Sequence, residues 1–268
     1  MDRVTTNFTG SIPEHYEAGL VPVVFIDYAQ EMTKRVVDLH PEKVLELASG
    51  TGVVTRLIRD RLAKDSILIA SDLNEPMLVI ARQKFKEHEK VVFEVIDAMA
   101  LPFTDQSINV ITCQFGVMFF PDKVASYGEA YRVLKTGGHY VFSTWDSLAR
   151  NIFAAIVQDV VEAIFPDDPP GFYKIPFHYN DPGQIRMDME KAGFSSVKVE
   201  QRKIRKAVPS LDAFAHALVF GNPLCQEVQM RNGDADAMVA RLQQALLKEY
   251  GQSAPVLELN VLFVTGQK

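Results

Sequence analysis

The chain is poor in cysteine and has no excess of positive charge. Its 268 residues include only two cysteines, Cys113 and Cys225, which are far apart and lack the C-x-x-C spacing of many metal sites. This pattern argues against a disulfide framework and against a zinc or other metal site. The formal net charge of −6 argues against a general binder of the nucleic-acid phosphate backbone.

Long apolar segments are also missing. The N-terminal stretch is polar and lacks the apolar region of a signal peptide, and the longest early apolar run, residues 20–26, is far too short to span a bilayer. We therefore expect a cytoplasmic protein. Apolar residues make up 47% of the chain and charged residues 23%, which is ordinary for a protein with a full hydrophobic core.

Strand-like and helix-like segments alternate regularly over residues 43–145. Strands are predicted at 43–48, 66–71, 91–96, 108–115 and 139–145, with helices at 53–64, 75–89 and 122–134, the last one closed by the turn "KTGG". These strands are continuous apolar runs, which are typical of parallel sheets covered on both faces. The alternation with short links predicts a doubly wound α/β fold.

Other elements flank this core. Val24, Tyr28, Met32 and Val36 share one face of a predicted helix at 23–39. After residue 146 the sequence predicts helices at 149–165 and 182–193, the second capped by Asn180, and at least two helices within 210–250. Two long strands, 195–208 and 256–267, are expected to pair at the sheet edge. The complete expectation is a seven-stranded, mostly parallel sheet with an antiparallel edge strand and a helical cap insertion.

The turn after the first predicted strand carries an acid and two closely spaced glycines. The stretch "VLELASGTGVVT" (44–55) contains Glu46, Gly50 and Gly52. Glycines at a strand-to-helix turn let a ligand approach the backbone, and the helix start offers free N–H groups. Asp72 ends the next strand, where its carboxylate is well placed to accept both hydroxyls of a ribose. Together these features indicate a cofactor that contains a nucleoside.

The chemistry of the turn favours one nucleoside cofactor over another. A dinucleotide site expects a third glycine, but Thr55 stands there, and Glu46 would repel a pyrophosphate. S-adenosylmethionine carries an ammonium, which Glu46 would attract, and no phosphate. We therefore prefer it over NAD. An NAD-type oxidoreductase and a non-catalytic cofactor-binding or interaction module stay open as alternatives.

Four motifs in order, "VLELASGTG", "SDLNEPML", "DAMALPF" and "EAYRVLKTGG", resemble those of class I S-adenosylmethionine-dependent methyltransferases. The series "LPF…FG.MFF.D…E..RVLK.GG" is most similar to the ubiquinone/menaquinone-biosynthesis-like branch, whose better-known members methylate small molecules. The resemblance covers roughly residues 40–146. It implies a Rossmann-like methyltransferase fold, S-adenosylmethionine as cofactor and methyl transfer by in-line displacement.

The resemblance also assigns the cofactor contacts. Glu46 would face the ammonium directly or through water, Asp72 would hold the ribose, and Leu73 would pack on the adenine, whose edge Asp97 and the backbone of Ala98 would read. The loop would accommodate the methionine part, Gln114 and Phe115 would line it near the sulfonium, and Tyr16 would close over the cofactor. The predicted cofactor-binding residues are Tyr16, Glu46, Ala48, Ser49, Gly50, Gly52, Asp72, Leu73, Met77, Asp97, Ala98, Gln114 and Phe115.

Simpler roles and departures from the family pattern qualify this set. Both glycines could serve the turn alone, Asp72 could cap the following helix, and Asp97 could be a surface turn acid. Ala48 stands where glycine is commonest in the family, so we expect a tighter loop and an intact site. Asn109 and Thr136 replace the usual aspartate and proline and touch no proposed cofactor contact.

No catalytic residue follows from the resemblance, because the sulfonium methyl is already activated and displacement requires alignment and the exclusion of water. A general base is needed only if the nucleophile carries a proton of high pKa, and His15, His178 and His216 are the candidates. The acceptor is expected to be a small apolar or aromatic molecule. The apolar residues that could line its pocket, or form only the core of the cap, are Phe153, Ile156, Phe165, Phe172, Phe177, Phe214, Leu218 and Phe220.

The sequence divides into three predicted parts. Residues 1–40 form an N-terminal helical segment that closes over the cofactor site, 41–146 form the S-adenosylmethionine-binding core, and 147–268 complete the sheet and form the substrate cap. Beyond the small-molecule acceptor, the sequence predicts no nucleic-acid partner and no membrane span, and it does not distinguish a monomer from a homodimer.

Overall fold

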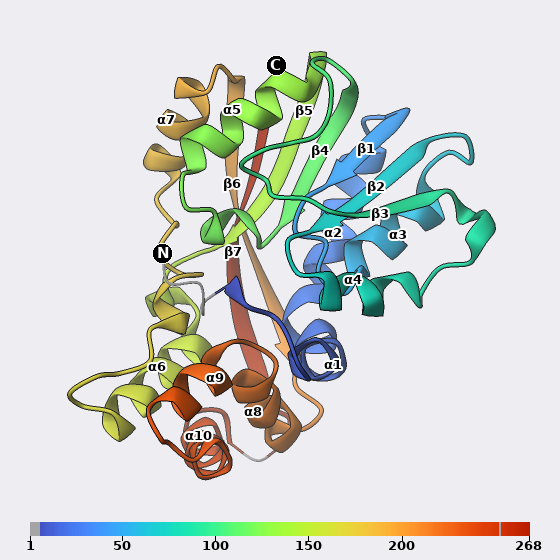
Figure 1. The fold of residues 1–268 in the computed structure, drawn as a ribbon. Helices are drawn as coiled ribbons and strands as arrows, with labels where there is room; N and C mark the ends of the chain where they lie inside the picture. The colour runs from blue at the N-terminus through green and yellow to red at the C-terminus, as the bar shows by residue number, and fades with distance from the viewer. Residues whose placement is uncertain (1–5, 252) are drawn as a thin grey trace.

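A computed structural model, which describes residues 6–251 and 253–268, contains a seven-stranded sheet in the order β3-β2-β1-β4-β5-β7-β6 (Figure 1). The strands are β1 (Lys43–Glu46), β2 (Ile67–Asp72), β3 (Val91–Val95), β4 (Ile108–Gln114), β5 (Leu134–Trp145), β6 (Ser195–Ala207) and β7 (Val256–Gln267). Strands β1 to β5 run parallel, and β7 inserts antiparallel between β5 and β6. The predicted fold class is confirmed.

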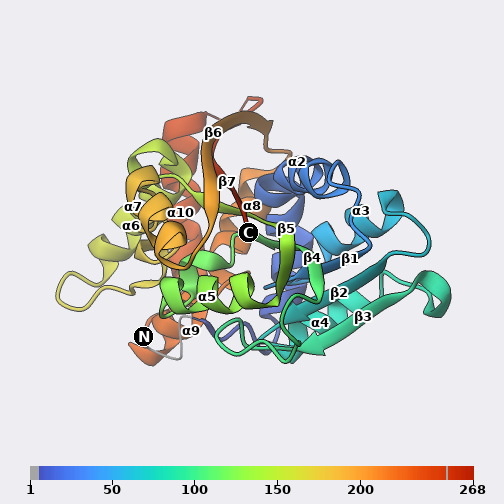
Figure 2. The same cartoon turned by 90° about the horizontal axis from the view of Figure 1, so that it is seen from above.

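Helices cover both faces of the sheet. Figure 2 shows α2 and α3 on one side and α5 and α7 on the other. The α-helices are α1 (Ile12–His15), α2 (Ile26–Val37), α3 (Val53–Arg61), α4 (Glu75–Arg82), α5 (Lys123–Val133), α6 (Ile152–Ile164), α7 (Pro182–Lys191), α8 (Leu211–Phe220), α9 (Leu224–Met230) and α10 (Ala235–Tyr250). Helices α6, α8, α9 and α10 gather as a cap below the sheet in Figure 1. None of the helices in the described parts of the chain is long and apolar enough to cross a membrane.

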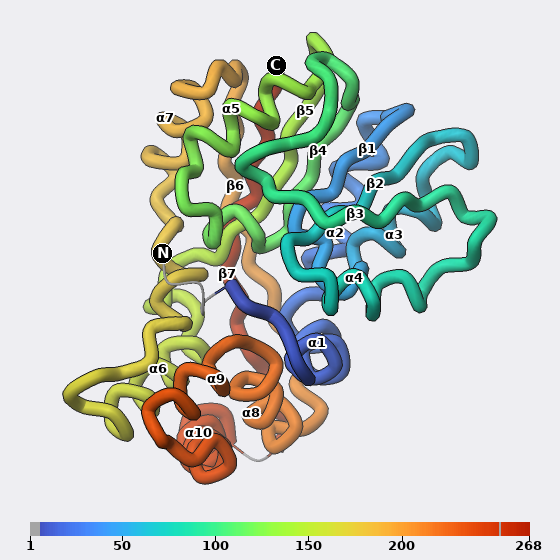
Figure 3. Tube along the Cα trace, in the orientation of Figure 1, coloured from blue at the N-terminus to red at the C-terminus, as the bar shows by residue number. Residues whose placement is uncertain are grey.

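The predicted N-terminal helix is divided in two. A π-helix, Tyr16–Phe25, precedes α2, and the buried side chains of Val24, Tyr28, Met32 and Val36 confirm the predicted inward face. Figure 3 shows residues 6–11, the described part of the chain before α1, running between the sheet and the cap helices. π-helices are rare and occur frequently at functional sites, so Tyr16–Phe25 marks a candidate functional region of the chain.

Three local predictions were wrong. Helix α4 ends at Arg82, well before the predicted end at residue 89, and Glu87–Glu89 is a separate 3-10 helix. Strand β5 begins at Leu134, so "KTGG" lies inside the strand; the backbone of Gly137 and Gly138 pairs with the backbone of Lys268, a partner distant in the sequence. The cap of α7 is Asp181, whose Oδ1 accepts from the Gly183 nitrogen at 2.7 Å. The amide of Asn180 instead donates to the carbonyl of Phe177. The predicted division of the chain at residues 40 and 146 stays a prediction.

Candidate cofactor and acceptor site

A cavity of about 400 Å³ opens at the carboxyl ends of β1, β2 and β4 and extends toward the cap. The predicted residues that line it are Tyr16, Ala48, Gly50, Asp72, Leu73, Met77, Asp97, Ala98, Gln114 and Phe115. Glu46, Ser49 and Gly52 do not line it, and all three lie in or beside the buried turn after β1. The topology therefore brings most of the predicted cofactor residues to one concave surface, as expected for an open parallel sheet.

Asp72 organises the polar edge of this cavity. Its Oδ2 accepts from the Gly50 nitrogen at 2.9 Å, and its Oδ1 accepts from the Asn74 nitrogen at 2.8 Å. Burial raises the pKa of the Asp72 carboxyl, although these backbone N–H groups act in the opposite direction. Beside it, the apolar side chain of Leu73 is 56% exposed on the cavity wall, where the flat face of an adenine would cover it.

Three residues of the turn after β1 have a left-handed backbone conformation. Ala48, Gly50 and Gly52 have φ values of 50°, 56° and 81°. A Cβ on Gly50 would lie 3.8 Å from the nearest atom, the Cε of Met77, so the space beside this residue is open. With no side chain at Gly50, a ligand in the cavity can approach the backbone there. A Cβ on Gly52 would lie 2.8 Å from the Cβ of Ala81, so Gly52 permits the start of α3 to lie close to Ala81 of α4. The structure thus gives Gly52 a packing role that the sequence analysis did not foresee.

Several buried oxygens at and near the turn lack hydrogen-bond partners among the described residues, including Glu46 Oε2, Gln114 Oε1 and the hydroxyl oxygens of Ser49, Thr51 and Thr55. The Glu46 side chain is 1% exposed. Burial raises the pKa of the Glu46 carboxyl to about 8. Unpaired buried acceptors are costly, and a cation with N–H donors would satisfy them. The donor and acceptor set therefore fits a ligand with a ribose and an ammonium.

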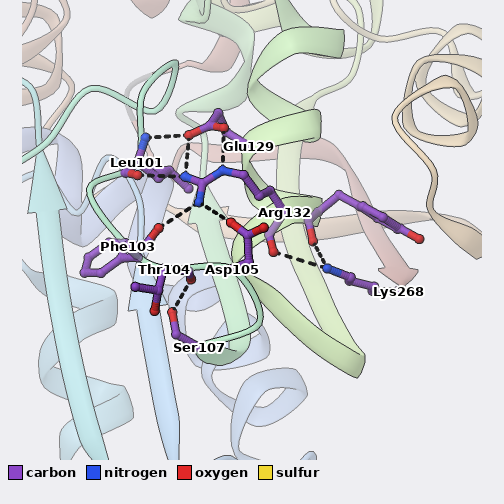
Figure 4. Close-up of polar contacts among 9 residues, drawn as sticks. Leu101, Phe103, Thr104, Asp105, Ser107, Glu129, Arg132 and Lys268 are labelled. Atoms are coloured by element: carbon purple, nitrogen blue, oxygen red, sulfur yellow. Dashed lines mark hydrogen bonds and ion pairs between the residues drawn. The ribbon is translucent and has the colours of Figure 1, made fainter.

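Arg132 fastens the loop that follows β3 (Figure 4). Its guanidinium donates to the carbonyls of Leu101 at 2.9 Å and Phe103 at 2.7 Å and pairs with Asp105 at 2.8 Å. Glu129 holds the same guanidinium and accepts from the Leu101 nitrogen at 2.9 Å. The "E..R" pair of the fourth motif therefore fixes the loop whose first residues, 97 and 98, line the cavity.

The other end of the cavity is built almost entirely of aromatic and aliphatic side chains. Phe115 and Trp145 stack with ring centroids 4.4 Å apart, and Phe177 also stacks with the Trp145 ring, with the centroids 5.6 Å apart. Further lining residues that the sequence analysis did not assign include Phe8, Leu20, Phe25, Met118, Phe119, Phe120, Tyr173 and Asn222. The quoted motif "FG.MFF.D" contained a signal for Met118 and the two following phenylalanines, whereas Phe8 and Asn222 had none.

Half of the proposed acceptor residues belong to the cavity wall. Phe153, Phe172, Phe177 and Leu218 line it, and Ile156, Phe165, Phe214 and Phe220 do not. The second set packs within or against the hydrophobic core, which was the alternative role.

The three candidate histidines lie elsewhere. His15 and His216 have ring centroids 5.0 Å apart, and neither lines the cavity; His178 is exposed and does not line it either. The ionisable residues among those that line the cavity are Asp72, Asp97, Tyr16 and Tyr173. Burial raises the pKa of both tyrosines, so both are neutral at ordinary pH. The geometry therefore gives no support to a histidine base.

The chain is similar in sequence to known methyltransferases. The chain is 33% identical over 138 residues to a demethylmenaquinone methyltransferase of Thermus thermophilus, which covers 50% of this chain and 62% of that protein. It is 29% identical over 228 residues to a ubiquinone/menaquinone biosynthesis C-methyltransferase of Methylococcus capsulatus, covering 72% of this chain and 92% of that one. The chain thus spans less than two thirds of the Thermus relative and most of the Methylococcus one.

Solved structures share the fold. A putative methyltransferase from Bacillus halodurans superposes with a TM-score of 0.56 at 18% identity, covering 88% of this chain and 98% of that one. A phosphoethanolamine N-methyltransferase of Haemonchus contortus, solved in complex with S-adenosyl-L-methionine, gives a TM-score of 0.61 at 17% identity, covering 98% of this chain and 58% of that one. The model of the ubiE/COQ5 methyltransferase family matches residues 26–166. The chain belongs to the ubiE/COQ5 methyltransferase family, and its cofactor is S-adenosylmethionine.

Proposed function

We propose that this chain transfers a methyl group from S-adenosylmethionine to a carbon atom of a small, apolar, quinone-like acceptor. The observation that carries the proposal is the continuity of one cavity, which joins the turn after β1 and Asp72 to a chamber walled by Phe115, Trp145 and Phe177. The names of the two relatives, a demethylmenaquinone methyltransferase and a ubiquinone/menaquinone C-methyltransferase, support a quinone-type acceptor.

The polar end of the cavity would bind the nucleoside part of the cofactor. Asp72 Oδ2 accepts the Gly50 N–H, and Oδ1 accepts the Asn74 N–H and, at 3.4 Å, the Asn74 side-chain amide. The remaining lone pairs of the carboxylate would accept the ribose hydroxyls. Leu73 and Ala98 would enclose the adenine, and Asp97, whose Oδ1 accepts from the Met99 nitrogen, would accept from its amino group. Glu46, behind the turn, would balance the ammonium.

The cofactor supplies a methyl group already activated by a sulfonium, so the protein has to align the acceptor and exclude water. Alignment of two reactants can contribute about 7–11 kcal/mol to a reaction of this kind. The stacked rings of Phe115, Trp145 and Phe177 form a rigid apolar wall for a flat acceptor. Phe8, in the segment before α1, packs edge-on against Phe119 and Phe172. This segment would help to shield the same chamber from solvent.

Among the described residues at the apolar end of the cavity, the ionisable side chains are neutral tyrosines. On this proposal the nucleophile therefore ionises without help from these side chains or reacts without losing a proton first. A carbon atom made electron-rich by an acidic ring hydroxyl meets this condition, and an aliphatic alcohol does not.

Calorimetry with S-adenosylhomocysteine, S-adenosylmethionine and NAD tests the cofactor part, with Asp72→Ala as the control variant. We expect binding of both adenosyl compounds, loss of that binding in Asp72→Ala, and no binding of NAD. Binding of NAD alone would favour the oxidoreductase alternative.

Turnover of a demethylmenaquinone in its ring-hydroxyl form, followed by detection of the C-methylated product, then tests the acceptor. Cofactor binding without methylation of any ring acceptor would favour the non-catalytic alternative.

A further inference from the structure

A polar cluster borders the apolar chamber at its cap end. Tyr173, in the turn Phe172–Lys174, and Asn222, between α8 and α9, are each 4% exposed, and both line the cavity together with Leu218. The surrounding wall is aromatic and aliphatic. A polar group buried in such a wall costs free energy unless it is hydrogen-bonded to the protein or to a ligand.

The hydrogen positions in this cluster are dictated by its fixed members. The carbonyl of Leu218 can only accept, and it receives the Tyr173 hydroxyl at 3.0 Å and the Asn222 Nδ2 at 2.9 Å. Asn222 Oδ1 accepts from the Leu224 nitrogen at 3.0 Å, which fixes the orientation of the amide. The second hydrogen of Nδ2 therefore donates to the Tyr173 oxygen, 3.2 Å away.

Every donor of the cluster is thus consumed inside it. The hydroxyl hydrogen of Tyr173 and both amide hydrogens of Asn222 point to protein atoms. What remains is acceptor capacity, one lone pair on the Tyr173 oxygen and one on Asn222 Oδ1. Because both residues line the cavity, we infer that these lone pairs attract a ligand O–H or N–H and repel a ligand atom that carries only lone pairs.

Resting on the proposed function, we propose that Tyr173 and Asn222 determine acceptor specificity by accepting a hydrogen bond from an O–H or N–H group of the methyl acceptor. The acceptor is then a neutral, mainly apolar ring compound with at least one hydrogen-bond donor. Ethers and carbonyl compounds of the same shape fit the apolar wall but lose the bond. A site built to pair with a donor rejects the analogue that lacks it more strongly than an apolar wall does.

The alternative role of the cluster is structural. Leu218 is one of the last residues of α8, and its carbonyl belongs to the helix end that lacks internal partners. Tyr173 and Asn222 satisfy that carbonyl, so their replacement is expected to lower stability whether or not they contact the acceptor. A decisive experiment has to measure ligand preference, which a purely structural role does not change.

The single tryptophan of the chain supplies the readout, because Trp145 lines the chamber. Its fluorescence is titrated with para-hexylphenol and para-hexylanisole in the presence of saturating S-adenosylhomocysteine. The two ligands share ring and tail, and the anisole carries O–CH3 in place of the phenol O–H. We expect wild-type protein to bind the phenol about ten-fold more tightly than the anisole, the value of roughly one hydrogen bond.

The variant Tyr173→Phe keeps the ring, removes one of the two accepting oxygens and frees one Asn222 Nδ2 hydrogen, so it should reduce the preference for the phenol. The matched control is Tyr28→Phe, which removes another buried hydroxyl-to-carbonyl bond, to Leu259 at 2.6 Å, outside the cavity wall. This control should keep the preference even where its melting temperature falls.

Several results would overturn the proposal. The first is equal affinity of the wild type for both ligands. The second is an undiminished preference for the phenol in Tyr173→Phe. The third is failure to bind either ligand by protein that binds S-adenosylhomocysteine. If Tyr173→Phe does not fold, a wild-type comparison of the phenol with para-hexylbenzaldehyde decides, because equal affinity there contradicts an accepting surface. Failure to bind S-adenosylhomocysteine, in contrast, would contradict the proposed function itself.

Discussion

The carboxylate of Asp72 holds the backbone of Gly50 across two neighbouring strand ends, with its Oδ2 2.9 Å from the Gly50 nitrogen. The acid after β2 therefore shapes the glycine turn after β1, and the same carboxylate is the proposed ligand of the ribose. The two candidate roles of Asp72, structural cap and cofactor ligand, belong to one arrangement, because the bond that fixes the turn also fixes the carboxylate.

Asp72→Asn should weaken S-adenosylhomocysteine binding by about 10–100-fold, since charge-assisted hydrogen bonds contribute about 1.5–3 kcal/mol. The melting temperature should also fall, because an amide presents at most one accepting oxygen to the N–H groups of Gly50 and Asn74. Calorimetry and thermal unfolding measure the two effects. Asp97→Asn is the control: its exposed carboxylate holds only the Met99 nitrogen, so the smaller loss is expected there. Unchanged affinity in Asp72→Asn would leave Asp72 with the structural role alone.

Arg132→Gln should destabilise the protein by about 1–3 kcal/mol, because the carbonyls of Leu101 and Phe103 lose their donor and Glu129 loses its partner. The loop that begins at Asp97 would loosen, so S-adenosylhomocysteine binding should weaken several-fold. Urea unfolding and calorimetry measure the two changes.

The control for this variant is Arg82→Gln. Arg82 pairs with Glu75 on the exposed face of α4, so its replacement should cost at most about 0.5 kcal/mol. Equal losses for the two arginines would contradict an anchoring role for Arg132.

Short-range patterns were enough to predict the sheet and the polar half of the site. The strands before Gly50 and Asp72 are apolar runs, and parallel strands place their carboxyl ends at one edge. The same rules do not reach the acceptor half. Phe8 and Asn222 arrive there from opposite ends of the chain through packing, and the start of β5 depends on pairing with Lys268.

The structural role of a residue was also harder to predict from the sequence than its position in the fold. Gly52 was expected to accommodate the cofactor, yet the contact that requires it is with Ala81, a residue of the next helix. The interpretation of Ala48 as a tighter turn stays a prediction, which a substitution can test.

Ala48→Gly should raise the free energy of unfolding by about 0.5–1 kcal/mol. Ala48 has a φ of 50°, a region that costs a side-chain-bearing residue about 1–2 kcal/mol, part of which the greater freedom of glycine in the unfolded chain offsets. Urea unfolding measures the change. A Cβ on Gly116 would lie 2.5 Å from that of Ala48, so Gly116→Ala is the opposing control and should destabilise. A loss of stability in Ala48→Gly would show that the methyl packs usefully.

The last prediction concerns the buried carboxyl of Glu46, whose pKa rises from 4.5 to about 8 on folding. Between these two values the unfolded chain is ionised at Glu46 and the folded chain is protonated, so unfolding releases a proton. The contribution of Glu46 to the free energy of unfolding is therefore complete below about pH 4.5 and is lost as the pH rises toward 8, by on the order of a few kcal/mol.

Glu46→Gln removes this titration and keeps the size of the side chain. Urea unfolding of both proteins below, within and above the window should give a wild-type curve that falls more steeply with pH than that of the variant. Parallel curves would contradict a raised Glu46 pKa. With saturating S-adenosylhomocysteine the difference should shrink, because an ammonium beside Glu46 favours the carboxylate and lowers its pKa. A difference that persists with bound ligand would place the ammonium away from Glu46 and assign it another partner in the cavity.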